Sequence, residues 1–330
     1  MAITYRDFIH PEDERAIQAI RAIPAYEAVS SWLMKVGVEP YYHSVFMADH
    51  VRLSPKQLPK IYNLLPPVCR KFGINEPEFY LQMDPNPGAF TIGDKQTFLV
   101  ITSGLLDCVT DSLELQSIIA HECGHIVCRH VFYSTLAQVL LSGDIIPFQS
   151  VGEKIIDNAT EVGRTVPVLS TFLVAAGIIT ASAQAALLAA LAYWFRRSEL
   201  SCDRASALFV GNADVPVKAL MRLVGGPSRF TADINVEEFA SQADDPASQT
   251  KWQRLLRGAK IVMQDHPFST VRANEIIKFA KTAKFSRMAK TLKEVDMGHA
   301  CSSCGKPISA RQKFCRYCGK KIQQQKGENK

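Results

Sequence analysis

Apolar residues recur with a helical period over most of the chain, and one short region has the pattern of strands. The helical segments are residues 13–34 with a break at Pro24, a segment that starts after Leu105 and continues past His125, residues 196–210 and residues 271–288. Asp111 and Glu114 have the spacing of a capping box at the start of the second segment. The strand-like runs are residues 79–83, 89–92 and 97–102. They predict a sheet of about three strands, and the whole pattern predicts an α+β fold that is mainly α.

Residues 165–195 contain no charged side chain. A single membrane crossing needs about 20 apolar residues, but Gly177 and the polar patch at residues 180–184 divide the stretch into two arms of about 13 residues. Such arms are about 20 Å long, shorter than the ~30 Å hydrocarbon core. We therefore predict a helical hairpin, and two placements stay open: packed against the helices of the core, or dipping into a membrane surface.

The composition is that of a globular protein, with 47% hydrophobic and 21% charged residues. The formal net charge is +6, but residues 301–330 hold eight basic residues and one acidic residue, so the tail carries +7 and the rest of the chain −1. Phe314 and Tyr317 are the aromatic residues of this tail, too few for a base-stacking surface. A neutral body with a basic tail therefore argues against a nucleic-acid-binding protein.

Four of the nine cysteines form two C-x-x-C pairs near the C-terminus, Cys301 with Cys304 and Cys315 with Cys318. The repeat C-x-x-C-G-K-x-I, with ten residues between the pairs, resembles the two knuckles of a zinc ribbon. Four thiolates give a closed tetrahedral site, which predicts a structural zinc ion. The basic residues around it can meet nucleic acid, anionic lipid or acidic protein, and the sequence leaves the partner of the ribbon open.

The N-terminal segment MAITYRDFIHPEDER has acidic residues where a secretory signal has a basic start and an apolar run. The other five cysteines are scattered singly. Unpaired thiols without an export signal predict a cytoplasmic location. Attachment to the cytoplasmic side of a membrane stays open because of the hairpin at residues 165–195.

The sharpest chemical signal is the H-E-x-x-H sequence at His121, Glu122 and His125. Residues four apart lie on one face of a helix, so both imidazoles can reach one metal ion. Glu122 lies beside them, where it can take a proton from a zinc-bound water that attacks a polarised carbonyl. The motif predicts a catalytic zinc ion.

A catalytic zinc needs a third protein ligand and an open position. Cys128 and Val131 stand where the metzincin extension requires Gly and His, and His130 is expected on the opposite side of the helix, at the surface or behind the ligands. Glu199 and Asp203, four residues apart, present two carboxylates on one helix face. One can bind the metal, and the other can accept a hydrogen bond from a zinc-bound histidine.

A third element is the sequence H-P-F-S-T-V-R from His266 to Arg272. Ser269 or Thr270 can cap a helix that begins near Val271. His266 can donate a hydrogen bond to a developing oxyanion, and Arg272 can pair with a carboxylate such as Asp203.

The order and spacing of these three motifs, over roughly residues 55–290, resemble the HtpX/CAAX-prenyl endopeptidase family of gluzincin zinc metallopeptidases. The resemblance implies a zincin-like domain with zinc bound by His121, His125 and Glu199. It implies that Glu122 is the general base. Members of this family are often integral membrane proteins.

The resemblance also assigns roles to the remaining motif residues. Asp203 would stand behind the ligands, while His266 and Arg272 would support the substrate and the transition state. Ala89, Phe90 and Thr91 resemble the edge strand on which the family binds a peptide by β-addition. Gly88 stands where an Asn commonly precedes the Ala.

The sequence thus predicts an N-terminal helical extension at residues 1–54 and a zinc metallopeptidase domain at 55–290. A zinc ribbon at 299–323 and a disordered tail at 324–330 follow. The predicted activity is zinc-dependent endopeptidase hydrolysis of protein or peptide substrates, with one catalytic and one structural zinc ion. The alternative is a non-proteolytic zinc-binding scaffold or chaperone-like module that acts through its ribbon.

Overall fold

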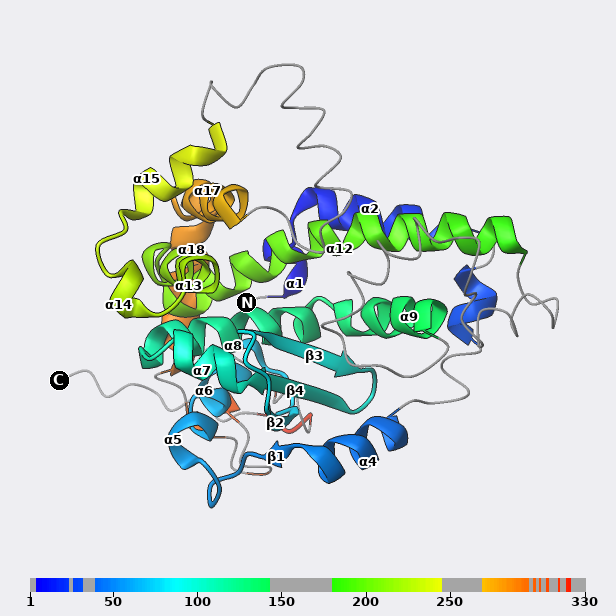
Figure 1. The fold of residues 1–330 in the computed structure, drawn as a ribbon, viewed down its shortest axis with the longest axis horizontal. Coiled ribbons are helices and arrows are strands. Elements are labelled where there is room, and N and C mark those ends of the chain that lie inside the picture. Colours follow the sequence, from blue (N-terminus) through cyan, green and yellow to red (C-terminus); the bar gives the residue numbers. More distant parts are fainter. Residues whose placement is uncertain are drawn as a thin grey trace.

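The computed structural model describes residues 4–23, 26–31, 39–142, 180–244 and 269–296. Within the C-terminal tail it describes residues 299, 300, 303, 307, 308, 314 and 319–321. The described chain is mostly helical with a small sheet, as predicted (Figure 1).

A mixed sheet of four strands has the order β1-β2-β4-β3. Its strands are β1 (Val51–Arg52), β2 (Glu78–Gln82), β3 (Ala89–Gly93) and β4 (Thr97–Thr102). Strands β2 and β4 are parallel, and the other two pairs are antiparallel. The three predicted strands are confirmed. The fourth strand, β1, has only two residues and both are exposed, so it carries no alternation that the sequence could reveal.

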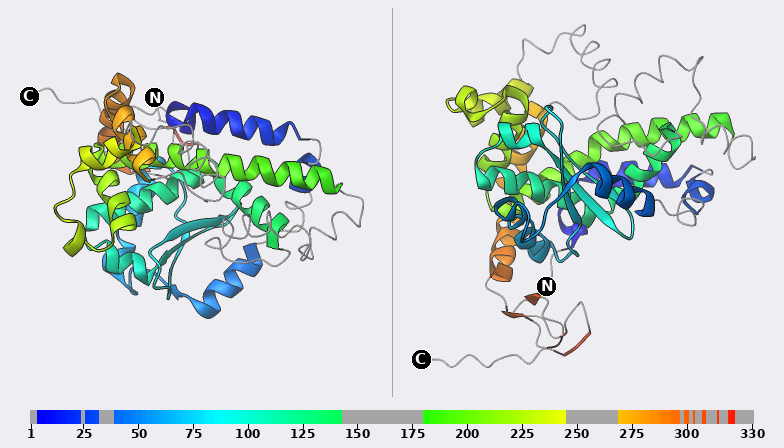
Figure 2. Two further views of the ribbon diagram at one scale, coloured as in Figure 1. Left: turned by 45° about the horizontal axis from the view of Figure 1, so that its top comes forward. Right: turned by 60° about the horizontal axis from the view of Figure 1, so that its bottom comes forward.

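Helices cover the sheet in successive layers, which Figures 1 and 2 show from three directions. Helices α8 (Ser112–Val127) and α9 (His130–Ser142) pack on β3. Helix α12 (Ala181–Val210) packs on α8 and α9, and α2 (Pro11–Arg21) packs on α12. Helix α12 therefore lies between α8 on one side and α2 on another.

Strand alternation separates two apolar clusters on the faces of the sheet. Phe90, Ile92 and Phe98 belong to a cluster with α2, α4 (Glu39–Asp49), α9 and the first half of α12. Leu99 and Ile101 belong to the cluster under α8. Thr91 is the register partner of Leu99 in the antiparallel pair β3–β4, so the Thr91 side chain points toward α8.

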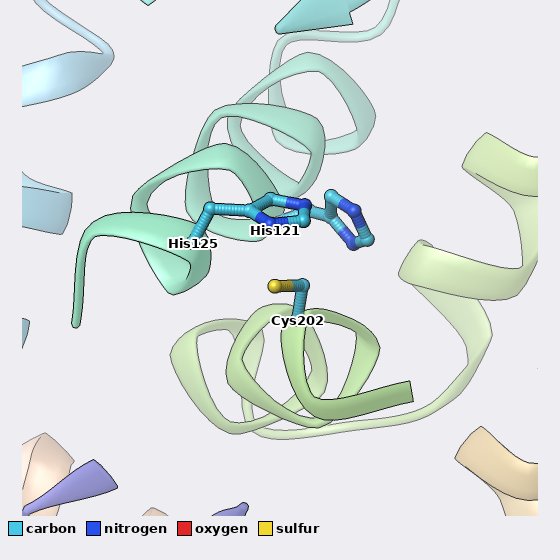
Figure 3. Close-up of side chains that lie close together, drawn as sticks. All are labelled: His121, His125 and Cys202. Atoms are coloured by element: carbon cyan, nitrogen blue, oxygen red, sulfur yellow. The ribbon is translucent and has the colours of Figure 1, made fainter. Parts of the chain in front are cut away.

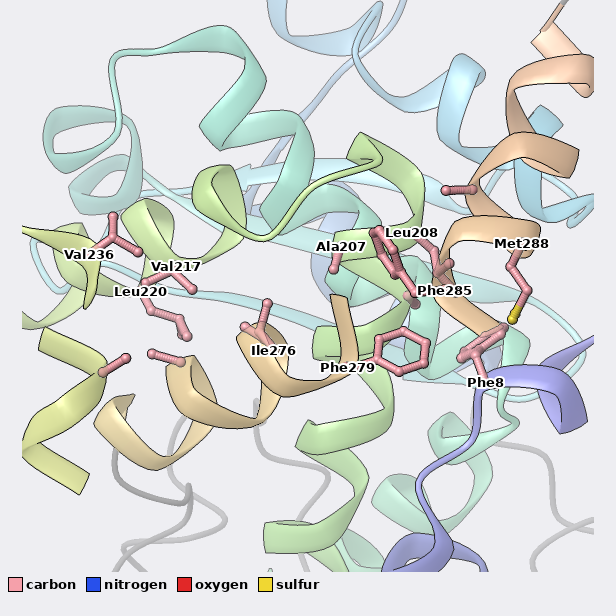
Figure 4. Packing of buried hydrophobic residues seen from close by; sticks show 14 of the residues in the cluster. Phe8, Ala207, Leu208, Val217, Leu220, Val236, Ile276, Phe279, Phe285 and Met288 are labelled. Carbon is pink, nitrogen blue, oxygen red and sulfur yellow. The ribbon is translucent and has the colours of Figure 1, made fainter. Parts of the chain in front are cut away.

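A third cluster joins the second half of α12 to the C-terminal helices (Figure 4). Its elements include α13 (Asp214–Gly225), α15 (Val236–Ser241), α17 (Ser269–Ala280) and α18 (Ala283–Asp296). Phe8 of α1 (Tyr5–Phe8) completes it. The remaining described elements are α5 (Pro59–Tyr62), α6 (Leu65–Phe72), α7 (Ser103–Cys108), α14 (Ser228–Thr231), the 3₁₀ turn η2 (Gln242–Asp244), and β5 (His299–Ala300) with β6 (Pro307–Ile308).

Helix α8 starts and stops at identifiable residues. The Asp111 side chain accepts the backbone N–H groups of Leu113 and Glu114, which confirms it as the N-cap. Glu114 does not complete the predicted capping box, because its carboxylate pairs with Arg222 of α13 at 3.1 Å. At the other end, Arg129 has a φ of 59°, so the helix breaks there and α9 starts at His130 in a new direction.

The second arm of the predicted hairpin and the predicted helix at 196–210 are one helix, α12, of 30 residues. Gly211, with a φ of 84°, ends it in the left-handed conformation. The first arm, residues 165–179, lies outside the described residues. In the described part of the chain no helix is both long and apolar enough to cross a membrane.

Two other predicted boundaries were wrong. The helix expected at 271–288 is two helices, α17 and α18, separated at residues 281–282, and Ser269 and Thr270 lie inside the first turn of α17 instead of capping it. The segment after Gly225 contains the short helices α14 and α15, which are not among the predicted helices. The tail at 324–330 lies outside the described residues.

Gly124 allows α8 and α12 to approach closely. A Cβ at this position would lie 3.0 Å from the Ala205 Cβ and 3.1 Å from the Cys202 Cα. Alanine normally favours a helix over glycine by about 1 kcal/mol. At a contact this tight, overpacking outweighs that gain.

We expect Gly124→Ala to lower the free energy of unfolding by about 1–3 kcal/mol, measured by urea denaturation. Adding Ala205→Gly removes the nearest opposing carbon and should recover part of the loss. A Gly124→Ala protein as stable as the wild type would contradict the steric explanation.

Candidate active site

His121 and His125 lie on the face of α8 that meets α12, as their spacing predicts (Figure 3). The Nε2 atom of His121 is 3.3 Å from one carboxylate oxygen of Glu199, and the Nε2 atom of His125 is 3.4 Å from the other. Glu199 is buried on α12. The structure therefore brings together two imidazoles and one carboxylate from motifs that are 74 residues apart in the chain.

Each imidazole lies at the spacing of a zinc ligand from one oxygen of Glu199. Two ligand atoms that lie about 2.1 Å from one ion at the tetrahedral angle are about 3.4 Å apart. The observed Nε2–oxygen distances of 3.3 and 3.4 Å match that spacing. The residues present thus fit a zinc ion.

Cys202 is a second potential donor, because one ligand atom each of His121, His125 and Cys202 lie within 4.8 Å of one another (Figure 3). Burial raises the pKa of the Cys202 thiol well above its ordinary value. The sulfur lies 3.5 Å from the Nδ1 atom of His130, which faces the Nδ1 atom of His125. Glu199 faces the Nε2 atoms of both histidines, so its geometry fits a third ligand better than that of Cys202.

Arg272 joins the two carboxylates of α12. Its guanidinium donates to both oxygens of Asp203 at 2.7 and 2.8 Å, and its Nη1 atom lies 3.0 Å from Glu199. Asp203 in turn lies 3.1 Å from the Nδ1 atom of His121. The predicted pairing of Arg272 with Asp203 is therefore present, and it includes Glu199 as well.

The charges of this cluster set its protonation. Burial on its own would lower the pKa of His121, but the charge of Glu199 and the hydrogen bond with Asp203 raise it to about 10. Burial also acts to raise the pKa of Asp203, and the charge of Arg272 outweighs it, so the pKa lies below its ordinary value. Burial lowers the pKa of His125. Since a histidine must be neutral to bind a metal, a zinc ion held here would have to displace the proton of His121.

Glu122 lies between α8 and the edge of the sheet. It is buried, and the Thr91 hydroxyl donates a hydrogen bond to its Oε2 atom at 3.0 Å. Strand β3 pairs with β4 along one edge and is the last strand of the sheet on its other side. The Phe90 side chain lies in the apolar cluster on the face of the sheet that is turned away from α8. Phe90 can therefore offer only its backbone groups to a molecule bound at the edge of β3.

Five predicted site residues cannot be placed. His266 and the ribbon cysteines Cys301, Cys304, Cys315 and Cys318 lie outside the described residues. The segments around the cysteines are partly described: β5 pairs antiparallel with β6 across the first C-x-x-C, and Phe314 pairs with Lys321 across the second. Each C-x-x-C thus stands between two segments that pair with each other, as in a ribbon knuckle.

His130 corrects one part of the sequence prediction. It was expected on the far side of a continuous helix, at the surface or behind the ligands; it is fully buried, which excludes the surface and agrees with the second position. Its Nδ1 atom lies 3.3 Å from the Nδ1 atom of His125, and its Nε2 atom lies 2.9 Å from Asp13. The break at Arg129 turns α9, so His130 returns toward the ligands and takes the position behind His125.

Sequence reasoning also missed Asp13, which contacts His130, Trp194 and Ser201. One signal was present: Asp13 stands four residues before Ile17, on the apolar face of its helix. A carboxylate on an apolar helix face is expected to have buried partners. Nothing in the sequence identified those partners.

A family model described as peptidase family M48 matches residues 55–280, and one described as a zinc-ribbon domain matches residues 299–322. The chain is 29% identical over 288 residues to the plastoglobule-localized metallopeptidase 48, chloroplastic, of Arabidopsis thaliana, covering 86% of this chain and 75% of that protein.

Protease HtpX homologs are also similar. The chain is 25% identical over 244 residues to that of Ralstonia nicotianae, covering 72% of this chain and 80% of the homolog. It is 37% identical over 90 residues to that of Dictyoglomus thermophilum, covering 27% of this chain and 29% of the homolog. No solved structure matches the chain significantly. These findings confirm the resemblance and the zincin-like fold class predicted from the motifs.

The buried cluster predicts the effect of Asp203→Asn, which removes one of the charges that Arg272 compensates. We expect a loss of about 3–5 kcal/mol of unfolding free energy and a 10–100-fold weaker zinc affinity, roughly the effect of losing an outer hydrogen-bond partner of a ligand. Urea unfolding and competition with a chelator measure the two quantities.

The matched control is Glu114→Gln, which breaks the buried pair of Glu114 with Arg222 between α8 and α13. It should destabilise the protein comparably and leave the zinc affinity unchanged. Equal zinc affinities of the two variants would show that Asp203 has no part in the metal site.

Proposed function

The chain belongs to peptidase family M48 and is a metallopeptidase, and from that premise we propose that it is a zinc-dependent endopeptidase with Glu122 as its general base. The observation that carries the proposal is the assembly of His121, His125 and Glu199 at zinc-ligand spacing, with the Glu122 carboxylate on the next residue of the same helix. Protein or peptide substrates follow from the family.

His121, His125 and Glu199 would hold the zinc ion. When bound, zinc supplies a Lewis acid that polarises the scissile carbonyl and acidifies a water molecule. Glu122 takes the proton of the attacking water on its carboxylate and passes it to the leaving amine. The Thr91 hydroxyl, which donates to Glu122 Oε2 at 3.0 Å, restricts the orientation of that carboxylate.

The arrangement around Arg272 supports a positioning role for this residue. Its contacts to Asp203 and Glu199 fix both carboxylates, and Asp203 orients His121 through Nδ1. The role of His266 in stabilising the transition state stays a prediction, because this residue lies outside the described ones.

Strand β3 supports a mode of substrate binding. Ala89, Phe90 and Thr91 form part of the edge strand beside Glu122. An extended peptide that pairs with the backbone of this edge would present its amide bonds beside the proposed ligands. Because the Thr91 and Phe90 side chains are buried, the strand would recognise the peptide by its backbone and not by its sequence.

For the tail, we propose a structural zinc ion held by Cys301, Cys304, Cys315 and Cys318. The match to a zinc-ribbon model and the two paired segments around the cysteines support it. The cytoplasmic location and the membrane association expected from the sequence stay predictions, which cell fractionation would test.

Replacing the base should separate chemistry from metal binding. We expect Glu122→Gln to lower kcat on casein by about 10²–10⁴-fold while zinc content is unchanged, since all three proposed ligands remain. A chelator should abolish wild-type activity, and added zinc should restore it. Activity that survives Glu122→Gln would contradict the mechanism.

The two metal sites should be separable by stoichiometry. We expect about two zinc ions per wild-type chain, and one each in Cys315→Ser/Cys318→Ser and in His121→Ala/His125→Ala, measured by elemental analysis. The histidine variant should lose casein hydrolysis because it lacks the catalytic zinc ion. The cysteine variant should keep its catalytic zinc ion. A single zinc ion in the wild type would contradict the proposed pair of sites.

A further inference from the structure

Asp13 of α2 is a buried carboxylate that the proposed mechanism leaves without a role. Its Oδ1 atom accepts a hydrogen bond from Trp194 Nε1 at 2.9 Å. Its Oδ2 atom accepts one from the Ser201 hydroxyl and lies 2.9 Å from His130 Nε2. The Ser201 oxygen accepts the His10 backbone N–H at 2.9 Å, so its own hydrogen is available to Asp13.

These partners determine the tautomer of His130. An ionised carboxylate can only accept, so the Nε2 atom of His130 carries the hydrogen that Asp13 accepts. In a neutral imidazole the other nitrogen is then a bare acceptor. The Nδ1 atom of His130 faces the Nδ1 atom of His125 at 3.3 Å and the thiol of Cys202 at 3.5 Å. Both neighbours can donate to it.

The tautomer of His125 follows from that of His130. Because two bare nitrogens at 3.3 Å would repel, His125 Nδ1 carries the hydrogen and donates it to His130 Nδ1. The lone pair of His125 is then on Nε2, which lies 3.4 Å from Glu199, and the zinc ion proposed between them would accept it. This is the form of the imidazole that binds a metal through Nε2.

We propose that Asp13 and His130 are positioning residues for the metal ligand His125, linked in the order Asp13, His130, His125, metal. The inference rests on the zinc site proposed above and goes beyond it. The relay starts on α2, outside residues 55–280 that the family model matches. The N-terminal helix thus contributes to the metal site.

The packing around the relay holds each ring in place. The Trp194 ring meets the His130 ring edge-on, with ring centroids 5.5 Å apart. The ring centroids of His125 and His130 are 5.2 Å apart, and the two ring planes form an angle of 69°. Neither His130 nor Asp13 is exposed to solvent. Water therefore cannot replace the hydrogen bond between Asp13 and His130 or the one between His130 and His125. If the group at position 13 changes, the tautomer of His130 must change with it.

Asp13→Asn tests the relay with a side chain of the same size. Its NH₂ group must face either Trp194 or the side of His130 and Ser201. In both cases the NH₂ group meets a hydrogen-bond donor where Asp13 offers an acceptor. We expect zinc affinity or kcat on casein to fall about 10–100-fold, with KM unchanged because Asp13 does not contact the substrate.

Ser117→Ala is the matched control, since Ser117 and Ser206 form a buried hydrogen bond at 3.0 Å between the same helices, α8 and α12. It should cost stability and leave zinc affinity, kcat and KM unchanged. If Asp13→Asn binds zinc and cleaves casein as well as Ser117→Ala does, Asp13 is only structural and the inference fails. A wild type that binds no zinc through His121 and His125 would instead overturn the proposed function, and the inference with it.

The tautomers can also be read in the wild type, so the test does not depend on the folding of a variant. In zinc-loaded protein labelled with ¹⁵N-histidine, long-range ¹H–¹⁵N correlations should show His130 protonated on Nε2 and bare on Nδ1. His125 should be protonated on Nδ1. The opposite tautomer of His130 would overturn the proposal.

Discussion

Arg272 lies between two buried carboxylates, Asp203 and Glu199, and its positive charge offsets part of theirs. The geometry of the proposed metal site depends on this balance of charge. A buried carboxylate without a partner is too costly to keep ionised. With Arg272 in place, both carboxylates can stay charged and fixed. The formal charges of Asp203, Glu199, Glu122 and Arg272 sum to −2, which a divalent cation cancels. The site is therefore complementary to zinc in charge as well as in spacing.

The same balance requires that the helices approach closely. Arg272 comes from α17, both carboxylates from α12 and the imidazoles from α8, so three separate helices must meet at one point. Gly124 permits this, because the space for its missing Cβ is taken by Ala205 and by the backbone at Cys202. Small side chains at the crossing bring the Nε2 atoms within 3.3 and 3.4 Å of Glu199. A bulkier crossing would separate the proposed ligands.

Short-range patterns predicted the parts of the structure that depend on neighbours in the chain. Three strands, the N-cap Asp111 and the shared helix face of His121 and His125 all follow from spacings of a few residues. The side of the helix predicted for His130 was wrong because one left-handed residue, Arg129, ends the helix that the sequence pattern predicted to continue. The partners of Asp13 could not be predicted, because its hydrogen bonds join residues 117 to 188 positions apart in the chain. No local sequence pattern indicates contacts over such separations.

The position of α12 between two helices explains why its sequence was hardest to interpret. Glu199 and Asp203 face α8 and α17, whereas Trp194 and Ser201, seven residues apart, face α2 through Asp13. The first half of α12 buries Leu187, Leu191 and Trp194 on one face and exposes Ala185, Ala186, Ala189 and Tyr193 on the other. Because these exposed residues carry no charge, this half reads as an uncharged stretch although it is only partly covered. The few polar groups it carries must then find buried partners on both sides. On one side they meet the proposed metal ligands, and on the other they meet Asp13, which links the N-terminal helix to the same site.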